Sequence, residues 1–297
     1  MVPTTSSSRK RTCSASSAEA MLKSGDLERV AALMRETAAA ELVPRFRNLS
    51  KDEVKLKRPG DVVTVADVAS EQRLASGLAA ILPGVPVVGE EAVEQDSGLL
   101  DLVARPDGTC WIVDPLDGTS NFADGKATFA MIVALVRNKE TVAGWILDVP
   151  GNRMAIAAKG QGVAVDGTPV HGKPMTRPEG YVGFKIKKTF DRELPAQHRQ
   201  KLGRIGTLRC AGHEYLNILA GQAGFSIYRM TKPWDHAAGT LMLREAGGEA
   251  LQFSGAPYAP AQPVNSGLIG AVSAAVLTEV RTVFEAAQLP LLAPPAQ

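Results

Sequence analysis

The sequence lacks a charge excess, a cysteine framework and a long apolar run, and each absence excludes a class of protein. Basic residues number 33 and acidic residues 31, so the formal net charge is only +2. No global field therefore favours nucleic acid or an anionic membrane as a partner. Cys13, Cys110 and Cys210 are far apart and form no metal-binding or disulfide pattern, which fits a cytoplasmic protein. The apolar run at residues 130–136 has the length of a strand, not of a membrane span.

The first 18 residues form a segment of distinct composition. They are basic and rich in Ser and Thr, and they lack the apolar run that a secretory signal needs. We interpret residues 1–18 as a disordered tail, and a targeting role for this tail remains open. The rest of the chain contains enough apolar residues, 45% of the whole sequence, to build a large core.

Hydrophobic spacing divides the remaining chain into two parts. Apolar residues at three-to-four spacing predict a helix from about residue 18 to Pro44, and residues 62–82 pass from a β-branched start into a second helix that ends before Pro83. A series of short strands between residues 85 and 165, separated by Gly, Asn, Pro and Asp, predicts an antiparallel sheet. Alternating strands and helices follow beyond residue 170. We expect an N-terminal α+β domain at residues 19–168, with most of the candidate ligands described next, and a C-terminal α/β domain at residues 169–297.

Acidic residues gather at predicted strand ends and helix starts, where side chains converge on clefts. In WIVDPLDGTSNF, an apolar strand leads to Asp114, Pro115 turns the chain, and Asp117 can face the same point. The carbonyl of Leu116 offers a further oxygen, so the segment suits Mg²⁺ or Mn²⁺. The other clusters contain Asp67, Glu90, Glu91 and Asp235.

The residues after this turn favour phosphate. Gly118, Thr119 and Ser120 open a predicted short helix, whose free amides can bind an anion. Cations beside amide donors are what metal-assisted phosphoryl hydrolysis needs. Each acidic segment alone has a simpler reading, such as an Asx turn or a helix cap. Their joint occurrence favours the chemical interpretation.

Four motifs together resemble the inositol monophosphatase family, part of a lithium-sensitive, metal-dependent phosphatase superfamily. They are DVVTVAD at residues 61–67, GEE at 89–91, DPLDGT at 114–119, and WDHAAG at 234–239 followed by EAGG at 245–248. Their order and spacing match over roughly residues 25–275, so a chance match is very improbable. The resemblance implies a layered α/β/α/β/α sandwich of the inositol monophosphatase and fructose-1,6-bisphosphatase type.

The resemblance also implies roles for single residues. Glu90, Asp114 and the Leu116 carbonyl would hold a first Mg²⁺, and Asp114, Asp117 and Asp235 a second; Glu90, and Asp67 through water, would help to hold a third. Thr119, paired with Asp67, would orient and deprotonate the attacking water, so Asp67, Thr119 and Glu90 are the catalytic candidates. The backbone amides of Gly118 and Thr119 would bind the phosphate. Glu91 would contact the metal ligands without binding the metal itself.

The sequence departs from the inositol-specific pattern outside these motifs. Tyr228 and Arg229 stand where inositol-specific members carry an acidic residue, and Arg229 could pair with a second phosphate or carboxylate. His213 and Glu214 replace small residues and could line the pocket or cap a helix. Lys185 and Lys187 alternate on a predicted strand, so they would share a face that could meet an anion, although a solvated strand edge is the favoured reading.

We therefore expect a magnesium-dependent phosphomonoesterase that hydrolyses inositol monophosphate or a related polyol or sugar phosphate. Histidinol phosphate, 3'-phosphoadenosine 5'-phosphate and fructose 1,6-bisphosphate remain alternative substrates. A non-catalytic, metal-dependent sugar-phosphate binding or regulatory protein is the alternative class. The resemblance further suggests inhibition by Li⁺ and a homodimer.

Overall fold

The computed structural model describes residues 22–23, 25–173 and 175–286, so the predicted tail at residues 1–18 lies outside the described residues. Two helices form the first layer. Helix α1 (Asp26–Thr37) continues into a π-helical turn at Ala38–Leu42, and α2 (Val65–Ile81) packs beside it. In the described part of the chain, no helix is long and apolar enough to cross a membrane.

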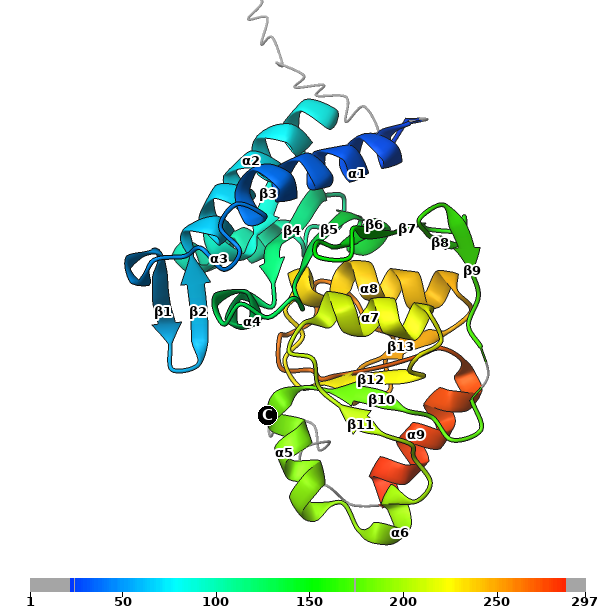
Figure 1. Ribbon diagram of the computed structural model, residues 1–297. Helices are drawn as coiled ribbons and strands as arrows, with labels where there is room; N and C mark the ends of the chain where they lie inside the picture. Colours follow the sequence, from blue (N-terminus) through cyan, green and yellow to red (C-terminus); the bar gives the residue numbers. More distant parts are fainter. Residues whose placement is uncertain (1–21, 24, 174, 287–297) are drawn as a thin grey trace, which may run out of the picture.

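A seven-stranded sheet forms the second layer beneath α1 and α2 (Figure 1). Its strands run in chain order, and every neighbouring pair is antiparallel except β3 and β4, so the predicted antiparallel sheet is confirmed for all but that pair. The strands are β3 (Val87–Gly89), β4 (Thr109–Asp117), β5 (Ala130–Arg137), β6 (Glu140–Asp148), β7 (Arg153–Ala158), β8 (Val163–Val165) and β9 (Thr168–Val170).

Helices α7 (Ala211–Leu219) and α8 (Pro233–Glu245) lie between this sheet and a second one (Figure 1). Two glycines allow close packing here. A Cβ on Gly144 of β6 would lie 2.8 Å from the Cα of Ala238, and one on Gly239 would lie 2.2 Å from the Tyr215 ring. Both helices are buried along most of their length, as the middle layer of a sandwich must be.

The second sheet has five strands in the order β11-β10-β12-β14-β13. They are β10 (Gly180–Val182), β11 (Ile205–Gly206), β12 (Phe225–Tyr228), β13 (Glu249–Leu251) and β14 (Leu268–Ala271). Helices α5 (Phe184–Glu193), α6 (Ala196–Arg199) and α9 (Ala274–Ala286) lie on its outer side (Figure 1). The layers therefore follow the predicted order α/β/α/β/α.

Short elements connect these layers. Strands β1 (Val54–Arg58) and β2 (Asp61–Thr64) form an antiparallel hairpin before α2, and η2 (Lys51–Glu53) precedes it. Helix α3 (Glu90–Gln95) follows β3, η3 (Ser97–Leu102) follows α3, and α4 (Thr119–Ala123) follows β4. The sequence did not predict the hairpin, α3, η3 or α9.

The predicted strand carrying Lys185 and Lys187 is wrong. Strand β10 ends at Val182, and both lysines lie on helix α5. Within this helix Ile186 and Phe190, four residues apart, are buried, so the helix has an apolar stripe of helical period. Lys187 pairs with Asp191 one turn later, at 2.6 Å, so the two lysines do not share the face of a strand.

Candidate active site

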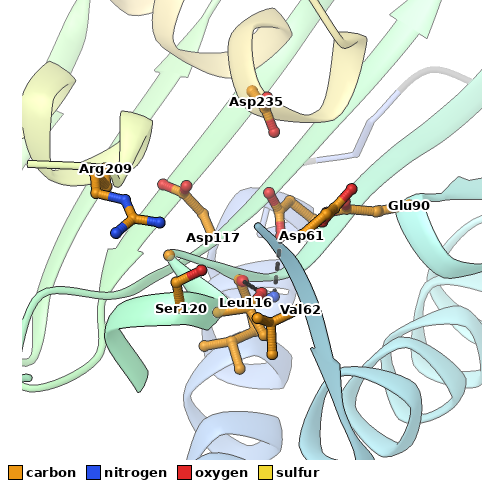
Figure 2. Close-up of a pocket in the computed structure, with 11 residues that line it drawn as sticks. Asp61, Val62, Glu90, Leu116, Asp117, Ser120, Arg209 and Asp235 are labelled. Carbon is orange, nitrogen blue, oxygen red and sulfur yellow. Dashed lines mark hydrogen bonds between the residues drawn. The ribbon is translucent and has the colours of Figure 1, made fainter. Parts of the chain in front are cut away.

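Three carboxylates from distant parts of the chain meet in one cavity. Glu90 begins α3, Asp114 lies in β4, and Asp235 lies in the first turn of α8. Their carboxylate oxygens lie within 4.8 Å of one another, the arrangement expected of groups that could share a cation. Figure 2 shows Glu90 and Asp235 pointing toward the same space, with Asp61 of the hairpin beside them.

The end of β4 explains how Asp114 reaches this point. The strand is buried along nearly its whole length, and its pairing with β5 shifts register between Asp114 and Asp117. One Asp114 oxygen accepts the backbone N–H of Leu116 at 3.0 Å, which fixes the turn. Gly118 then adopts a φ of 88°, a left-handed conformation that suits glycine, before α4 begins at Thr119. Leu116, Gly118 and Thr119 all line the cavity.

Asp117 lines the same cavity but is held differently from the other three carboxylates. Its Oδ2 accepts the backbone N–H of Gly212 at 2.6 Å and the Cys210 thiol at 3.1 Å. These bonds tie the end of β4 to the start of α7. The structure thus brings three of the four predicted carboxylate ligands together as a tight group, with the fourth, Asp117, and the fifth predicted ligand, Leu116, on the wall of the same cavity.

Glu71, which the sequence analysis did not single out, fixes the turn that carries Glu90. Its carboxylate accepts the backbone N–H groups of Glu91 and Ala92, both at 2.9 Å. A Cβ on Gly89 would lie 2.2 Å from this carboxylate, so glycine is required where β3 meets α3. Glu91 does not line the cavity, and its side chain accepts a hydrogen bond from Lys57 at 2.6 Å.

Asp67 and Thr119 lie in direct contact. The Thr119 hydroxyl is 2.9 Å from Asp67 Oδ1 and also 2.9 Å from the Leu116 carbonyl oxygen. Asp67 Oδ2 accepts the backbone N–H and the hydroxyl of Thr64, which caps helix α2. Burial raises the pKa of Asp67 to about 7, against the stabilising effect of the Thr64 hydrogen bonds.

The cavity is strongly acidic, and its electrostatics favour a bound cation. Burial, followed by the charges of Glu90, Asp117 and Asp235, raises the pKa of Asp114 well above its usual range. Burial also raises the pKa of Asp235 to about 8, although the nearby Lys232 ammonium opposes the shift. Buried carboxylates together with a backbone carbonyl are the hard oxygen donors that Mg²⁺ and Mn²⁺ prefer, so the donor set fits either ion.

Two lysines supply positive charge at Glu90. Lys232 Nζ lies 3.2 Å from Glu90 Oε1, and Lys57 Nζ lies 3.5 Å from the same oxygen. Burial lowers the pKa of each lysine, but the negative charge of Glu90 and of the neighbouring carboxylates outweighs this effect and raises it. Neither lysine belonged to a recognised motif, because each reaches Glu90 only through the tertiary fold.

A second cavity of about 610 Å³ adjoins the acidic one and shares Asp117, Arg209 and Asp235 with it. Tyr228 and Arg229, predicted substrate residues, line this cavity, as does Glu214. His213 does not line either cavity; its Nε2 lies 3.2 Å from Asp148 Oδ1 and 3.1 Å from the Phe129 carbonyl oxygen. His213 therefore connects α7 to the seven-stranded sheet.

The family assignment follows from this fold and these motifs. The model of the inositol monophosphatase family matches residues 26–284. The chain belongs to this family. Its fold is likewise that of inositol monophosphatases: the Thermotoga maritima enzyme structure superposes with a TM-score of 0.73 at 23% identity, covering 88% of this chain and 98% of that one. A structure described as inositol monophosphate-bound SaIMPase-II gives a TM-score of 0.69 at 21% identity, covering 86% and 92%.

Relatives in the family carry more than one name. The inositol-1-monophosphatase of Bacillus subtilis is 27% identical over 240 residues, which cover 78% of this chain and 88% of that protein. The fructose-1,6-bisphosphatase/inositol-1-monophosphatase of Aquifex aeolicus is 29% identical, covering 70% and 78%. The Nus factor SuhB of Pseudomonas aeruginosa is 29% identical, covering 75% and 84%. Family membership therefore indicates a phosphatase without fixing its substrate.

Proposed function

We propose that this protein is a magnesium-dependent phosphomonoesterase that releases inorganic phosphate from a small phosphate ester. One observation carries the proposal: the carboxylates of Glu90, Asp114 and Asp235, of which Asp114 is buried and the other two are half-buried, converge in the cavity that Thr119, the partner of Asp67, also lines. Glu90, Asp114, Asp117, Asp235 and the Leu116 carbonyl would hold two or three Mg²⁺ ions, or Mn²⁺ in their place. Bound there, the ions would acidify water and neutralise charge on the phosphoryl group.

Thr119 and Asp67 would orient the attacking water. With its hydroxyl proton donated to Asp67, Thr119 keeps oxygen lone pairs free to accept a hydrogen bond from water. This contact directs the water oxygen toward phosphorus. The new bond from that oxygen to phosphorus would form as the bond to the alcohol oxygen breaks; the water loses one proton, the alcohol oxygen takes one up, and inorganic phosphate and the free alcohol are the products. The backbone amides of Gly118 and Thr119, on the cavity wall, would bind the phosphoryl oxygens.

The substrate, the inhibitor and the assembly are proposed from the family. By resemblance to the family, the substrate is inositol monophosphate or a related polyol or sugar phosphate, Li⁺ inhibits the reaction, and the chain acts as a cytoplasmic homodimer. The Nus factor name of one relative supports a second candidate, a metal-dependent binding protein without catalytic activity. Both candidates would bind Mg²⁺, but only the first would turn substrate over.

Phosphate release separates the two candidates. The purified full chain is assayed with inositol 1-phosphate, histidinol phosphate, 3'-phosphoadenosine 5'-phosphate and fructose 1,6-bisphosphate, with Mg²⁺ and with EDTA. Catalytic turnover that requires Mg²⁺ and disappears in Asp114→Asn supports the phosphatase. Absence of turnover on every substrate, by a chain that binds Mg²⁺, would contradict it and support the binding protein.

A further inference from the structure

The second cavity lies where the alcohol part of a substrate must extend. It shares Asp117, Arg209 and Asp235 with the acidic cavity, so a phosphoryl group bound beside Asp114 and Thr119 would point the rest of its molecule into it. Its volume of about 610 Å³ exceeds the needs of a single small ring and leaves room for a further substituent. The side chains on its wall should therefore recognise the leaving group.

Of the three acidic groups on this wall, Asp235 belongs to the carboxylate cluster, and the other two, Glu214 and Asp117, already have hydrogen-bond donors within the protein. Glu214 is 1% exposed; it accepts the Tyr228 hydroxyl at 2.5 Å and the backbone N–H of Leu208 at 2.7 Å. Burial raises its pKa to about 8. Asp117 accepts donors from the start of α7. The wall thus offers few free acceptors for the hydroxyl groups of a neutral polyol.

The basic groups on the same wall, in contrast, form no salt bridges with the residues that the structure describes. Lys185, Arg209 and Arg229 all line the cavity, and none forms a salt bridge within 4.0 Å to a residue that the structure describes. Lys187, two residues from Lys185 but away from the cavity, is paired with Asp191. Three positive charges therefore remain available where the leaving group would lie.

Arg209 is held in place for this role. Its backbone has a φ of 56°, a conformation rare for residues other than glycine, and Glu214 accepts the backbone N–H of the preceding residue, Leu208, at 2.7 Å. Its guanidinium lies 5.3 Å from the centre of the Phe184 ring, a cation–π distance. Figure 2 shows this guanidinium pointing from the edge of the acidic cavity toward Asp117. Glu214 and Tyr228 act here as positioning residues.

We propose that the natural substrate carries a second anionic group, a phosphate, sulfate or carboxylate on its leaving alcohol, and that Arg209, Lys185 and Arg229 bind it. The inference rests on the proposed phosphatase function and narrows its substrate class from polyol and sugar phosphates in general to those with a second anion, a group that inositol monophosphate lacks. Arginine suits this task because its planar fork binds two oxygens of such a group at once. Phe184 and Met230, large apolar side chains that are 47% and 50% exposed, flank the same cavity and would contact the carbon skeleton between the two anions.

Matched substrates that differ by one phosphate test the proposal. Fructose 1,6-bisphosphate is compared with fructose 1-phosphate, and 3'-phosphoadenosine 5'-phosphate with 3'-AMP, by kcat/KM for the first phosphate released. We expect the doubly charged member of at least one pair to be preferred about ten- to hundredfold, and Arg209→Gln to reduce that preference about tenfold. Lys185→Gln and Arg229→Gln should reduce it as well. Lys187→Gln, on the same helix but outside the cavity, is the control and should leave it unchanged.

Two results would overturn the assignment. Equal kcat/KM within both pairs would mean that no second anion is recognised, and equal losses on both members in Arg209→Gln would mean that Arg209 binds the transferred phosphate instead. Binding keeps the test separate from turnover. In EDTA, where the carboxylates repel anions, calorimetry should detect fructose 6-phosphate binding at least about tenfold tighter than fructose. Equal binding of the two would overturn the inference even if no substrate is hydrolysed, whereas the phosphatase proposal fails only on turnover.

Discussion

Asp114 is 1% exposed, and the charges of Glu90, Asp117 and Asp235 act on it in the same cavity. Asp114→Asn removes a proposed ligand without changing the size of the side chain. We expect Mg²⁺-dependent kcat/KM to fall by at least about a thousandfold. The melting temperature in EDTA should not decrease, because one source of repulsion is gone. Near-normal activity in this variant would exclude Asp114 as a ligand.

Thr119 and Asp67 form a single hydrogen-bonded unit, with 2.9 Å between their oxygens. Thr119→Ala and Asp67→Asn should each lower kcat by about two to four orders of magnitude, with a small change in KM. The double variant should lose little more than the worse single variant, because either change breaks the same contact. Since Asp67 also caps α2, melting curves must accompany the kinetics. Losses that multiply in the double variant would mean that the two residues act independently.

His236 should make the stability of the protein depend on pH. Burial lowers its pKa from 6.5 to about 4, and its ring nitrogens lie 3.1 Å from the Tyr215 hydroxyl and the Met230 carbonyl oxygen. Between pH 6.5 and pH 4 the unfolded chain binds a proton that the folded chain does not, so stability falls as the pH decreases through this window. The contribution from pH 7 to pH 5 is about 2 kcal/mol.

Urea unfolding in EDTA at several pH values measures this dependence. His236→Gln keeps a donor and an acceptor in similar positions but cannot titrate. We expect it to lose about 2 kcal/mol less than the wild type between pH 7 and pH 5. Parallel losses in the two proteins would mean that the imidazole is not buried in its neutral form.

Spacing along the chain indicated a shared site only where the chemistry is local, and the family resemblance added the distant residues Asp67, Glu90 and Asp235. Asp114, Leu116, Asp117 and Thr119 follow one another in a single turn, so their spacing alone indicated a shared site. Glu71, Lys57 and Arg209 were missed because each reaches the site from a different part of the fold. No spacing within the chain indicates such contacts. The tertiary structure is needed to find them.

At the scale of elements, the packing of α7 against α8 positions Asp235. Gly239→Ala would place a Cβ 2.2 Å from the buried Tyr215 ring and push the helices apart. We expect a loss of about 1–3 kcal/mol in stability and a decrease in activity, because α8 carries Asp235 in its first turn. Gly206→Ala, where the nearest atoms are at 3.6 Å, is the matched control. An unchanged unfolding free energy in Gly239→Ala would show that this helix contact tolerates a methyl group.

Elements with a strong period were predicted correctly, whereas several elements with a weak or mixed period were not. Helix α2 and strands β4 to β8 have clear apolar patterns and turn residues at their ends. The segment after β10 was predicted as a strand because its lysines alternate, but Ile186 and Phe190 give it a helical stripe that favours α5. The hairpin of β1 and β2 has little buried surface, so its residues carry no pattern that distinguishes it from a turn. Local propensity decides such segments only weakly.

At the scale of the whole molecule, bound cations should stabilise the fold. Mg²⁺ at about 100 times its dissociation constant contributes about 2.7 kcal/mol, which corresponds to a rise of roughly 5 °C in melting temperature. Thermal unfolding with and without Mg²⁺ measures this rise, and Asp114→Asn should abolish most of it. An equal rise in wild type and variant would mean that Mg²⁺ binds elsewhere.

The division into domains at residues 168 and 169 stays a prediction.

The three clustered carboxylates come from α3, β4 and α8. In the sequence, β4 precedes strands β10, β11 and β12 of the second sheet, and α8 follows them. No fragment that ends before α8 contains the complete set. A refolding chain can therefore bind a cation with full affinity only after α8 has packed beside α3 and β4. Contacts between segments so distant in sequence form late in folding. Recovery of cation binding during refolding would report the completion of the native topology, whereas recovery of helical signal would report only its local parts.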